Sequence, residues 1–206
     1  NALYISNMSS SAQAPLYVSV SDWDVDSMKY MQPKINDRGG KSVNLISTQL
    51  NRSLHISTPL MMTWGISDYT NEHGESDGKF SMQLNFPNDD YRKPATDEFL
   101  EKFKAFEEKI LDDAVKHSEA WFGEDMSREV AKHTFFPTLK YPKEKLGNNQ
   151  WGDPDYTRNP TMKIKLPYWE GVWNTEIYNM SGECQYRPVR KETDTFQSTG
   201  TPTELI

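Results

Sequence analysis

The chain has 206 residues, with 23 Lys and Arg against 30 Asp and Glu, and a formal net charge of −7. This total disfavours a domain that binds nucleic acid through its overall charge, because such domains are usually basic. The single cysteine, Cys184, excludes an internal disulfide and a cysteine-based zinc site. No apolar run reaches the roughly 18 residues of a membrane span, and the first residues lack the features of a signal peptide. These observations predict a soluble intracellular protein with one domain, or one domain with an insertion.

The first part of the chain predicts irregular structure followed by strands. Residues 1–41 are rich in serine and acidic residues and show no sustained period, which predicts an arm with at most short strands. Residues 42–47 and 53–57 flank Asn51-Arg52 and predict a β-hairpin. In residues 79–86, apolar and polar side chains alternate for four periods, which predicts a strand with one buried face.

One long helix is predicted in the middle of the chain. Thr96 is a suitable N-cap, and apolar residues then recur at three- and four-residue spacing as far as about Trp121. Gly123 is expected to end this helix. A short second helical segment is predicted at residues 126–133.

Strands are predicted to resume after the helices. Residues 135–141 predict a strand, and the Pro- and Gly-rich residues 142–160 predict a long loop. Residues 161–166 alternate apolar side chains with lysines, and we expect them to form a hairpin with residues 172–179 across Gly171.

This order of elements predicts a mainly β protein of the α+β class. Strands, one long helix and further strands favour an antiparallel sheet with an inserted helix, arranged as a small Greek-key barrel. The predicted organisation is an N-terminal arm of residues 1–41, a barrel domain of residues 42–190 and an extended segment of residues 191–206. The helical insertion within the barrel domain covers residues 96–133.

The known catalytic signatures are absent from the sequence. It contains no Gly-rich phosphate loop, no nucleophile elbow, no zinc-protease motif and no Cys-x-x-Cys pair. The four histidines lie in different predicted elements, and Cys184 has no recognisable catalytic partner. The acidic pairs of the long helix alternate with lysines, as on a solvated helix face. We therefore predict that the protein is not an enzyme and holds no metal and no cofactor.

One stretch of the chain is basic and rich in aromatic residues. Residues 134–191 carry nine basic and six acidic side chains and three tryptophans. Single-stranded nucleic acid is bound without sequence readout by cations along the backbone and by rings on which bases stack. Lys163 and Lys165 share the polar face of one predicted strand. A second interpretation stays open, in which these lysines are ordinary exposed residues and Trp169 and Trp173 belong to the core.

The succession of motifs resembles a known family. A Gly-Lys-Phe strand at residues 78–86 leads into Asn-Phe-Pro-Asn-Asp, followed by a long amphipathic helix at residues 99–115. The sequence Pro-Thr-Met-Lys-Ile-Lys-Leu-Pro-Tyr-Trp at residues 160–169 comes next, with a predicted hairpin after it. This order resembles the single-stranded-DNA-binding proteins of T-odd bacteriophages, and more closely their relatives in the nucleocytoplasmic large DNA viruses of algae and protists. The resemblance covers residues 42–179.

The resemblance implies an OB-fold barrel with an inserted helix that binds single-stranded DNA in a cationic, aromatic groove during replication or recombination. Proteins of this family usually continue through further strands and often end in an acidic tail, whereas this chain ends at Thr-Glu-Leu-Ile. By position, the resemblance assigns to the groove Lys163, Lys165, Tyr168 and Trp169. The distribution of charge and rings adds Lys140, Tyr141, Arg158 and Trp173.

The resemblance also implies partners and a location. Single-stranded DNA is the expected ligand, and replication proteins, virion components and further copies of the chain are the expected protein partners. The implied place is the host nucleus or a cytoplasmic virus factory, with packaging in the virion as a further option. The alternative function is a virion-associated structural or assembly protein that keeps the fold and has lost DNA binding. The acidic total and the irregular ends of the chain support this alternative.

Overall fold

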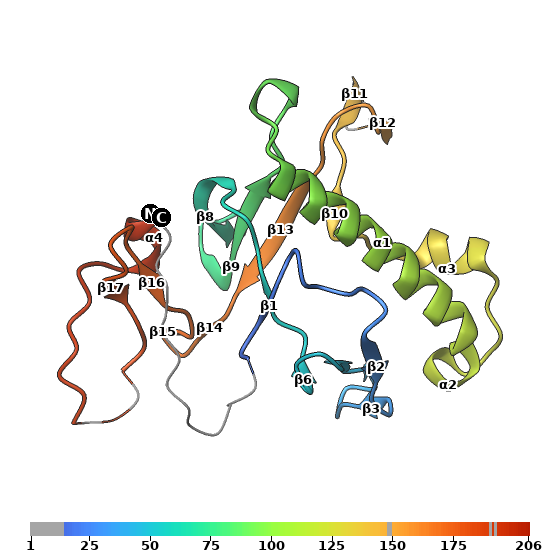
Figure 1. Cartoon of the computed structure of the whole chain (residues 1–206), viewed down its shortest axis with the longest axis horizontal. Coiled ribbons are helices and arrows are strands. Elements are labelled where there is room, and N and C mark those ends of the chain that lie inside the picture. Colours follow the sequence, from blue (N-terminus) through green and yellow to red (C-terminus); the bar gives the residue numbers. More distant parts are fainter. Residues whose placement is uncertain (1–14, 148–149, 190, 192) are drawn as a thin grey trace. The chain divides into compact units, whose positions relative to one another are not determined.

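The computed structural model describes residues 15–147, 150–189, 191 and 193–206. The chain is a mixed α+β protein, composed mostly of strands with one long helix (Figure 1). It divides into two compact units, Asn1–Pro59 with Asp97–Phe136 and Leu60–Thr96 with Pro137–Ile206. The boundaries of these units differ from the predicted ones at residues 41 and 190. The arm, barrel domain and extended segment therefore stay a prediction about domain organisation.

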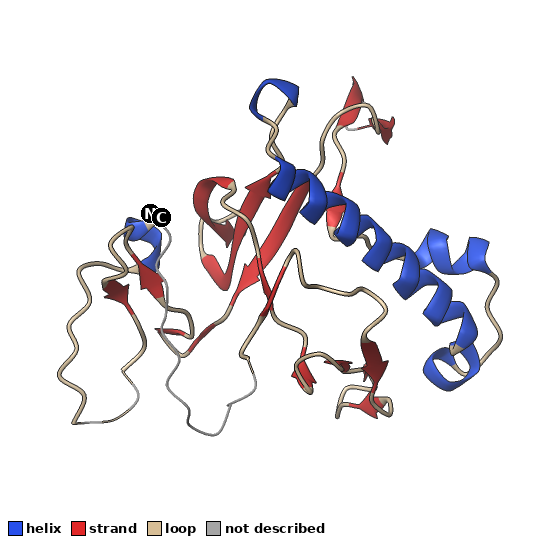
Figure 2. Ribbon diagram, in the orientation of Figure 1, coloured by secondary structure: helices blue, strands red, loops and turns tan. Residues whose placement is uncertain are grey.

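The predicted helices are present in the first unit (Figure 2). The long helix α1 spans Pro94–Lys116, so it begins two residues before the expected cap. Thr96 lies inside the first turn, where its hydroxyl donates a hydrogen bond of 2.8 Å to the Lys93 carbonyl. Proline is well suited to a first turn because its missing N–H would have no partner there. The predicted N-cap at Thr96 was therefore wrong.

Two short helices follow α1. Helix α2 spans Ser118–Phe122 and ends at Gly123, whose φ of 89° is that of a left-handed cap. The sequence placed this end on the long helix, so the expected continuation of that helix to about Trp121 was wrong, and α1 ends at Lys116. Helix α3 spans Arg128–Thr134, and the Ser127 side chain caps it by accepting a hydrogen bond from the Val130 N–H. A single 23-residue helix therefore dominates this unit.

The core of the first unit joins the segment before residue 59 to α1. Trp23 is buried, with Val18 and Leu50 beside it, and Phe103 and Phe106 of α1 pack against this cluster. The ring centroids of Trp23 and Phe106 lie 5.5 Å apart in a tilted arrangement. Aromatic side chains bury the most area per residue, so this cluster supplies much of the unit's hydrophobic stabilisation.

The strands of the first unit are all short. The predicted hairpin is confirmed in its central part, where β5 (Leu45–Ser47) pairs with β6 (Arg52–Ser53) across a turn that holds Asn51 at φ 51°. Strand β5 also pairs with β2 (Met28–Tyr30), so these three strands form one small antiparallel sheet. The remaining pairs are parallel β1 (Val18–Ser19) with β7 (Ile56–Ser57), and antiparallel β3 (Lys34–Ile35) with β4 (Lys41–Ser42).

The second unit contains a four-stranded antiparallel sheet (Figure 1). Its order is β10 (Leu139–Lys140), β13 (Thr161–Leu166), β9 (Ser76–Asn85) and β8 (Met62–Thr70). The predicted strands at residues 79–86 and 161–166 are confirmed as β9 and β13, the two central strands. Strand β8 was not predicted, and it pairs with β9 across a turn at residues 71–75.

Alternation gives this sheet one buried face. Leu139, Met162 and Leu84 lie in one cross-strand row and are all buried. Phe86 is buried just beyond the end of β9. The residues between them on each strand therefore point to the opposite, more exposed face.

Several predictions after residue 134 were wrong. The strand expected at residues 135–141 is reduced to the two residues of β10. The expected loop of residues 142–160 contains a hairpin of β11 (Lys143–Gly147) with β12 (Gln150–Pro154). Both strands of this hairpin are mostly exposed, so they lack the buried alternation by which a strand is recognised in sequence.

The partner expected for residues 161–166 was also wrong. β13 pairs with β9 and β10, and the hairpin across Gly171 is the smaller one of β14 (Tyr168–Trp169) with β15 (Val172–Trp173). The remaining elements of the second unit are the pair β16 (Ile177–Tyr178) with β17 (Cys184–Tyr186), the 3₁₀ helix η1 (Asp89–Tyr91) and helix α4 (Pro202–Leu205).

The Greek-key barrel is not observed. Within the described residues, the sheet ends at β10 and β8, and no sheet closes on itself. Closing a barrel requires its edge strands to pair along their length. Because β10 has only two residues, it offers few backbone groups for such pairing.

Candidate nucleic-acid interface

The exposed face of the four-stranded sheet carries three of the predicted binding residues. The strand register places Lys163 and Lys165 of β13 on this face, opposite Gln83 and Ser81 of β9. Lys140 of β10 pairs with Thr161 and therefore shares the same face. Residues that are far apart in the sequence thus form one surface.

Lys163 and Lys165 are exposed, and neither forms an ion pair with any residue that the structure describes. Their Cα atoms are two residues apart on an extended strand, which corresponds to about 7 Å. A solvated ammonium group with no carboxylate partner is available for an external anion. These two lysines are therefore the strongest cationic element of the face.

Lys79 is the fourth lysine of the exposed face, and a nearby carboxylate offsets part of its charge. It lies on the same side of β9 as Ser81 and Gln83, and its ammonium group is 2.5 Å from a carboxylate oxygen of Asp77. The hydrogen bond from Lys79 to Asp77 raises the pKa of the lysine. Ion pairing therefore makes this end of β9 less cationic than β13.

Trp169 is exposed beside the sheet. It lies on β14 and pairs with Val172 of β15, and 77% of its surface is accessible. Its neighbours Tyr168 and Trp173 form the other pair of this hairpin and contact Phe80. Trp169 therefore points away from that cluster, with its ring open to solvent.

Trp173 is placed in the core, contrary to its predicted role as a stacking ring. It is only 7% exposed, and its ring centroid lies 4.3 Å from that of Phe80 and 5.0 Å from that of Tyr168. Tyr168 is half-buried in the same cluster. A base cannot stack on a ring whose faces are covered, so the interpretation that treated Trp173 as a core residue is correct.

Tyr141 and Arg158 lie near the base of the β11–β12 hairpin. The Tyr141 ring is half-buried, with its centroid 4.8 Å from that of the exposed Tyr156. Arg158 is exposed and lines a cavity of about 360 Å³. The other residues lining this cavity are Pro142, Lys143, Glu144, Asp153 and Asp155. With three carboxylates beside two cations, it is a mixed-charge site and a poor phosphate site.

Sequence reasoning missed the exposed residues of β8. Met62, Trp64 and Tyr69 are all exposed on this strand, Trp64 at 80%. Met62 pairs with Asn85, in the row that contains Thr161 and Lys140. The alternation in Met62-Thr63-Trp64 was a usable signal, but Gly65 interrupts it after three residues.

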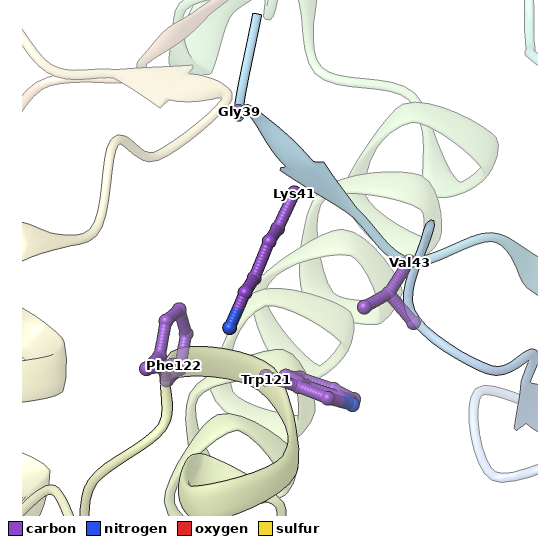
Figure 3. Close-up of a pocket in the computed structure, with 5 residues that line it drawn as sticks. All are labelled: Gly39, Lys41, Val43, Trp121 and Phe122. Carbon is purple, nitrogen blue, oxygen red and sulfur yellow. The ribbon is translucent and has the colours of Figure 1, made fainter. Parts of the chain in front are cut away.

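The first unit contains a shallow pocket of a different kind (Figure 3). Gly39, Lys41, Val43, Trp121 and Phe122 line a space of about 460 Å³, and the Lys41 side chain extends toward the two rings. Apart from the Lys41 ammonium group, the only polar side-chain group of this lining is the indole N–H of Trp121. The pocket therefore specifies no particular chemistry.

Tyr30 packs next to Trp121 in the first unit, with ring centroids 4.8 Å apart. Its hydroxyl donates a hydrogen bond of 2.7 Å to a carboxylate oxygen of Asp113. Burial, together with this bond, raises the pKa of Tyr30 above its ordinary value. The phenol therefore stays protonated at neutral pH and has a structural role.

Metal and redox sites receive no support from the described part of the chain. There, no group of three or more His, Cys, Asp or Glu side chains could hold a metal ion. Cys184 is half-buried, and its Sγ donates to the Tyr186 carbonyl at 3.3 Å. Among the described helices, none is long and apolar enough to cross a membrane.

No protein-family model, curated protein or solved structure matches this chain. The case for a function therefore depends on the geometry of the sheet and on the order of the sequence motifs.

Proposed function

We propose that this protein binds single-stranded DNA without reading its sequence, on the exposed face of the four-stranded sheet. The observation that carries the proposal is the pair Lys163 and Lys165, which are exposed, without ion pairs among the described residues, and on one face with Lys140. Trp64 and Trp169 supply exposed rings in the same unit. Cations and accessible rings together are what binding of an unpaired strand requires.

The net charge of −7 is compatible with this proposal, because the acidic excess is concentrated elsewhere in the chain. Residues 94–133, which contain α1, carry six basic and eleven acidic side chains. The exposed face of the sheet carries four lysines, and one of them is paired with Asp77. The lysines of this face are the charges that a bound strand contacts directly, and such contacts contribute to phosphate binding whatever the total charge of the chain.

The finer parts of the proposal depend on the order of motifs. That order supports a relationship between this sheet and the sheet of an OB fold. It also supports a role in viral-type DNA replication or recombination and an intracellular site of action. Replication proteins, virion components or further copies of the chain are the proposed protein partners. The sheet face alone supports strand binding and does not separate these contexts.

The test is a titration of labelled oligothymidine at two salt concentrations, with wild type and with Lys163→Glu/Lys165→Glu. Wild type is expected to bind more weakly at higher salt, and the double variant to lose most of its affinity. Two lysines that neutralise two phosphates of a single strand contribute about −1.4 to the slope of log K against log salt. The double variant should lack this contribution.

A matched control separates this site from general charge effects. Lys143→Glu/Lys145→Glu makes the same charge change at the same spacing on exposed β11, and we expect it to keep most of the affinity. Equal losses in the two variants would contradict a site on the sheet face. If folded wild type fails to bind at low salt, the proposal is wrong, and the virion-associated structural alternative is favoured.

A further inference from the structure

The edge strand β8 carries a bulge opposite Gln83. Thr63 pairs with Leu84 and Ile66 pairs with Met82, so residues 64–65 together face the single residue Gln83. A bulge of this kind redirects a side chain and is a common device near functional sites. The bulge therefore determines where the side chain of Trp64 points.

Trp64 points to the same face as the lysines of β13. Its neighbour Thr63 shares a row with the buried Leu84, so alternation directs Trp64 to the opposite face, together with Gln83 and Lys163. The ring is 80% exposed and has no ring contact with any described residue. The ring is therefore accessible to a ligand.

Gly65 makes this arrangement specific. Its φ is +95°, a conformation that residues with a side chain rarely adopt. A Cβ built at this position would lie 2.9 Å from the carbonyl oxygen of Ile206, which is too close. Glycine is therefore required next to Trp64, and the conformation of the bulge depends on it.

The cationic and the aromatic side chains of the exposed face lie on different strands. On the β13 side it carries the unpaired cations Lys163 and Lys165, and on the β8 side it carries the rings Trp64 and Tyr69. The strand between them, β9, presents neutral polar side chains at Ser81 and Gln83, followed by Lys79, whose charge is paired with Asp77. β13 and β8 are two strand spacings apart, or about 10 Å.

We infer that a bound single strand runs along β13 with its phosphates on Lys163 and Lys165, extends its bases across β9, and stacks one of them on Trp64. This inference rests on the proposed function and deepens it by assigning an orientation. A nucleotide is anionic at its phosphate and flat and weakly polar at its base. Its phosphate therefore suits the lysines of β13, and its base suits the ring of Trp64 on β8. In a duplex the bases are stacked on one another, and the same site cannot use them.

The deciding variant is Trp64→Ala, with Trp64→Phe as the conservative replacement and Trp151→Ala as the matched control. Trp151 is another exposed tryptophan, on β12. Stacking of one base contributes about 1–3 kcal/mol, so Trp64→Ala should weaken oligothymidine binding about 5- to 150-fold. Trp64→Phe should keep most of the affinity, and Trp151→Ala all of it.

The salt dependence distinguishes a ring contact from a phosphate contact. Trp64→Ala should leave the slope of log K against log salt unchanged, whereas Lys163→Gln should reduce its magnitude by about 0.7. A strand of abasic sugar-phosphate should bind wild type more weakly than oligothymidine does, and bind Trp64→Ala about as tightly as wild type. The wild-type comparison needs no variant, so it remains decisive if Trp64→Ala misfolds.

The outcomes separate the two proposals. Loss of binding in the lysine variants with unchanged affinity in Trp64→Ala overturns the orientation and leaves the proposed function standing. An altered salt slope in Trp64→Ala, or equal wild-type affinity for abasic and thymidine strands, also overturns the orientation. Failure of wild type to bind any single strand at low salt overturns both.

Discussion

The long helix of the first unit and the sheet of the second use the same residue types in opposite ways. On α1, Lys102 lies 3.2 Å from Glu98, Lys104 lies 2.8 Å from Glu101, and Lys109 lies 3.1 Å from Asp113. On β13, Lys163 and Lys165 have no carboxylate partner among the described residues. A lysine count alone therefore says little about binding, because the neighbours decide whether the charge is already used.

The aromatic residues repeat this contrast. Phe103 and Phe106 of α1 pack against the buried Trp23, while Trp64 and Trp169 of the second unit are exposed. Burial of large rings stabilises a fold, whereas exposed rings contribute little to stability and are available to a ligand. The lysines and rings of α1 stabilise their own unit, whereas Lys163, Lys165, Trp64 and Trp169 of the second unit stay exposed.

The largest expected effect compares Trp23→Ala with Trp169→Ala. Trp23 is buried against two phenylalanines, so its removal should lower the free energy of unfolding by about 3–5 kcal/mol. Trp169→Ala should change it by less than about 0.5 kcal/mol, as expected for an exposed side chain. Chemical denaturation followed by circular dichroism measures both, and similar losses would break the comparison between the two regions.

A smaller effect is expected from the lysines. The Lys102 ammonium donates to the carbonyls of Val20 at 2.6 Å and Ser21 at 2.9 Å, so it joins α1 to the N-terminal segment of its unit. Lys102→Ala should therefore lower the free energy of unfolding by about 1–2 kcal/mol. Lys165→Ala, with no such partner, should leave it nearly unchanged. If Lys165→Ala proves as destabilising as Lys102→Ala, the lysines of β13 have a structural role.

The smallest effect concerns pH and the Tyr30–Asp113 hydrogen bond. The folded state raises the pKa of Tyr30 above its ordinary value of 10.0, so folding favours the protonated phenol. The stability that follows is fully present below pH 10 and is lost as the pH rises from there toward the folded-state pKa. Tyr30→Phe should remove this part of the alkaline loss, and melting curves of both proteins between pH 8 and 11 measure it. Identical alkaline profiles would show that the bond does not link stability to pH.

Local patterns were sufficient for the regular elements and for one part of the candidate site. The alternation in residues 79–86 and 161–166 predicted the two central strands, and the apolar stripe predicted the long helix, although not its ends. Because side chains alternate on any strand, the common face of Lys163 and Lys165 followed from their spacing. Their role in DNA binding stays a prediction.

The rest depended on which segments meet. Whether Trp169 or Trp173 is exposed depends on which side of their hairpin contacts Phe80, a residue about 90 positions earlier in the chain. The β11–β12 hairpin was missed because its strands are exposed on both faces, and barrel closure was overpredicted because local pattern does not specify edge pairing.

The sequence by itself determined the periods of α1, β9 and β13, because helix and strand periods are properties of the local backbone. Only the tertiary structure decided that the bulge at Gly65 directs Trp64 to the face that carries Lys163. The register between β8, β9 and β13 joins residues about 100 positions apart in the chain. Such a register is selected by the packing of the whole sheet, and no short window of sequence contains it.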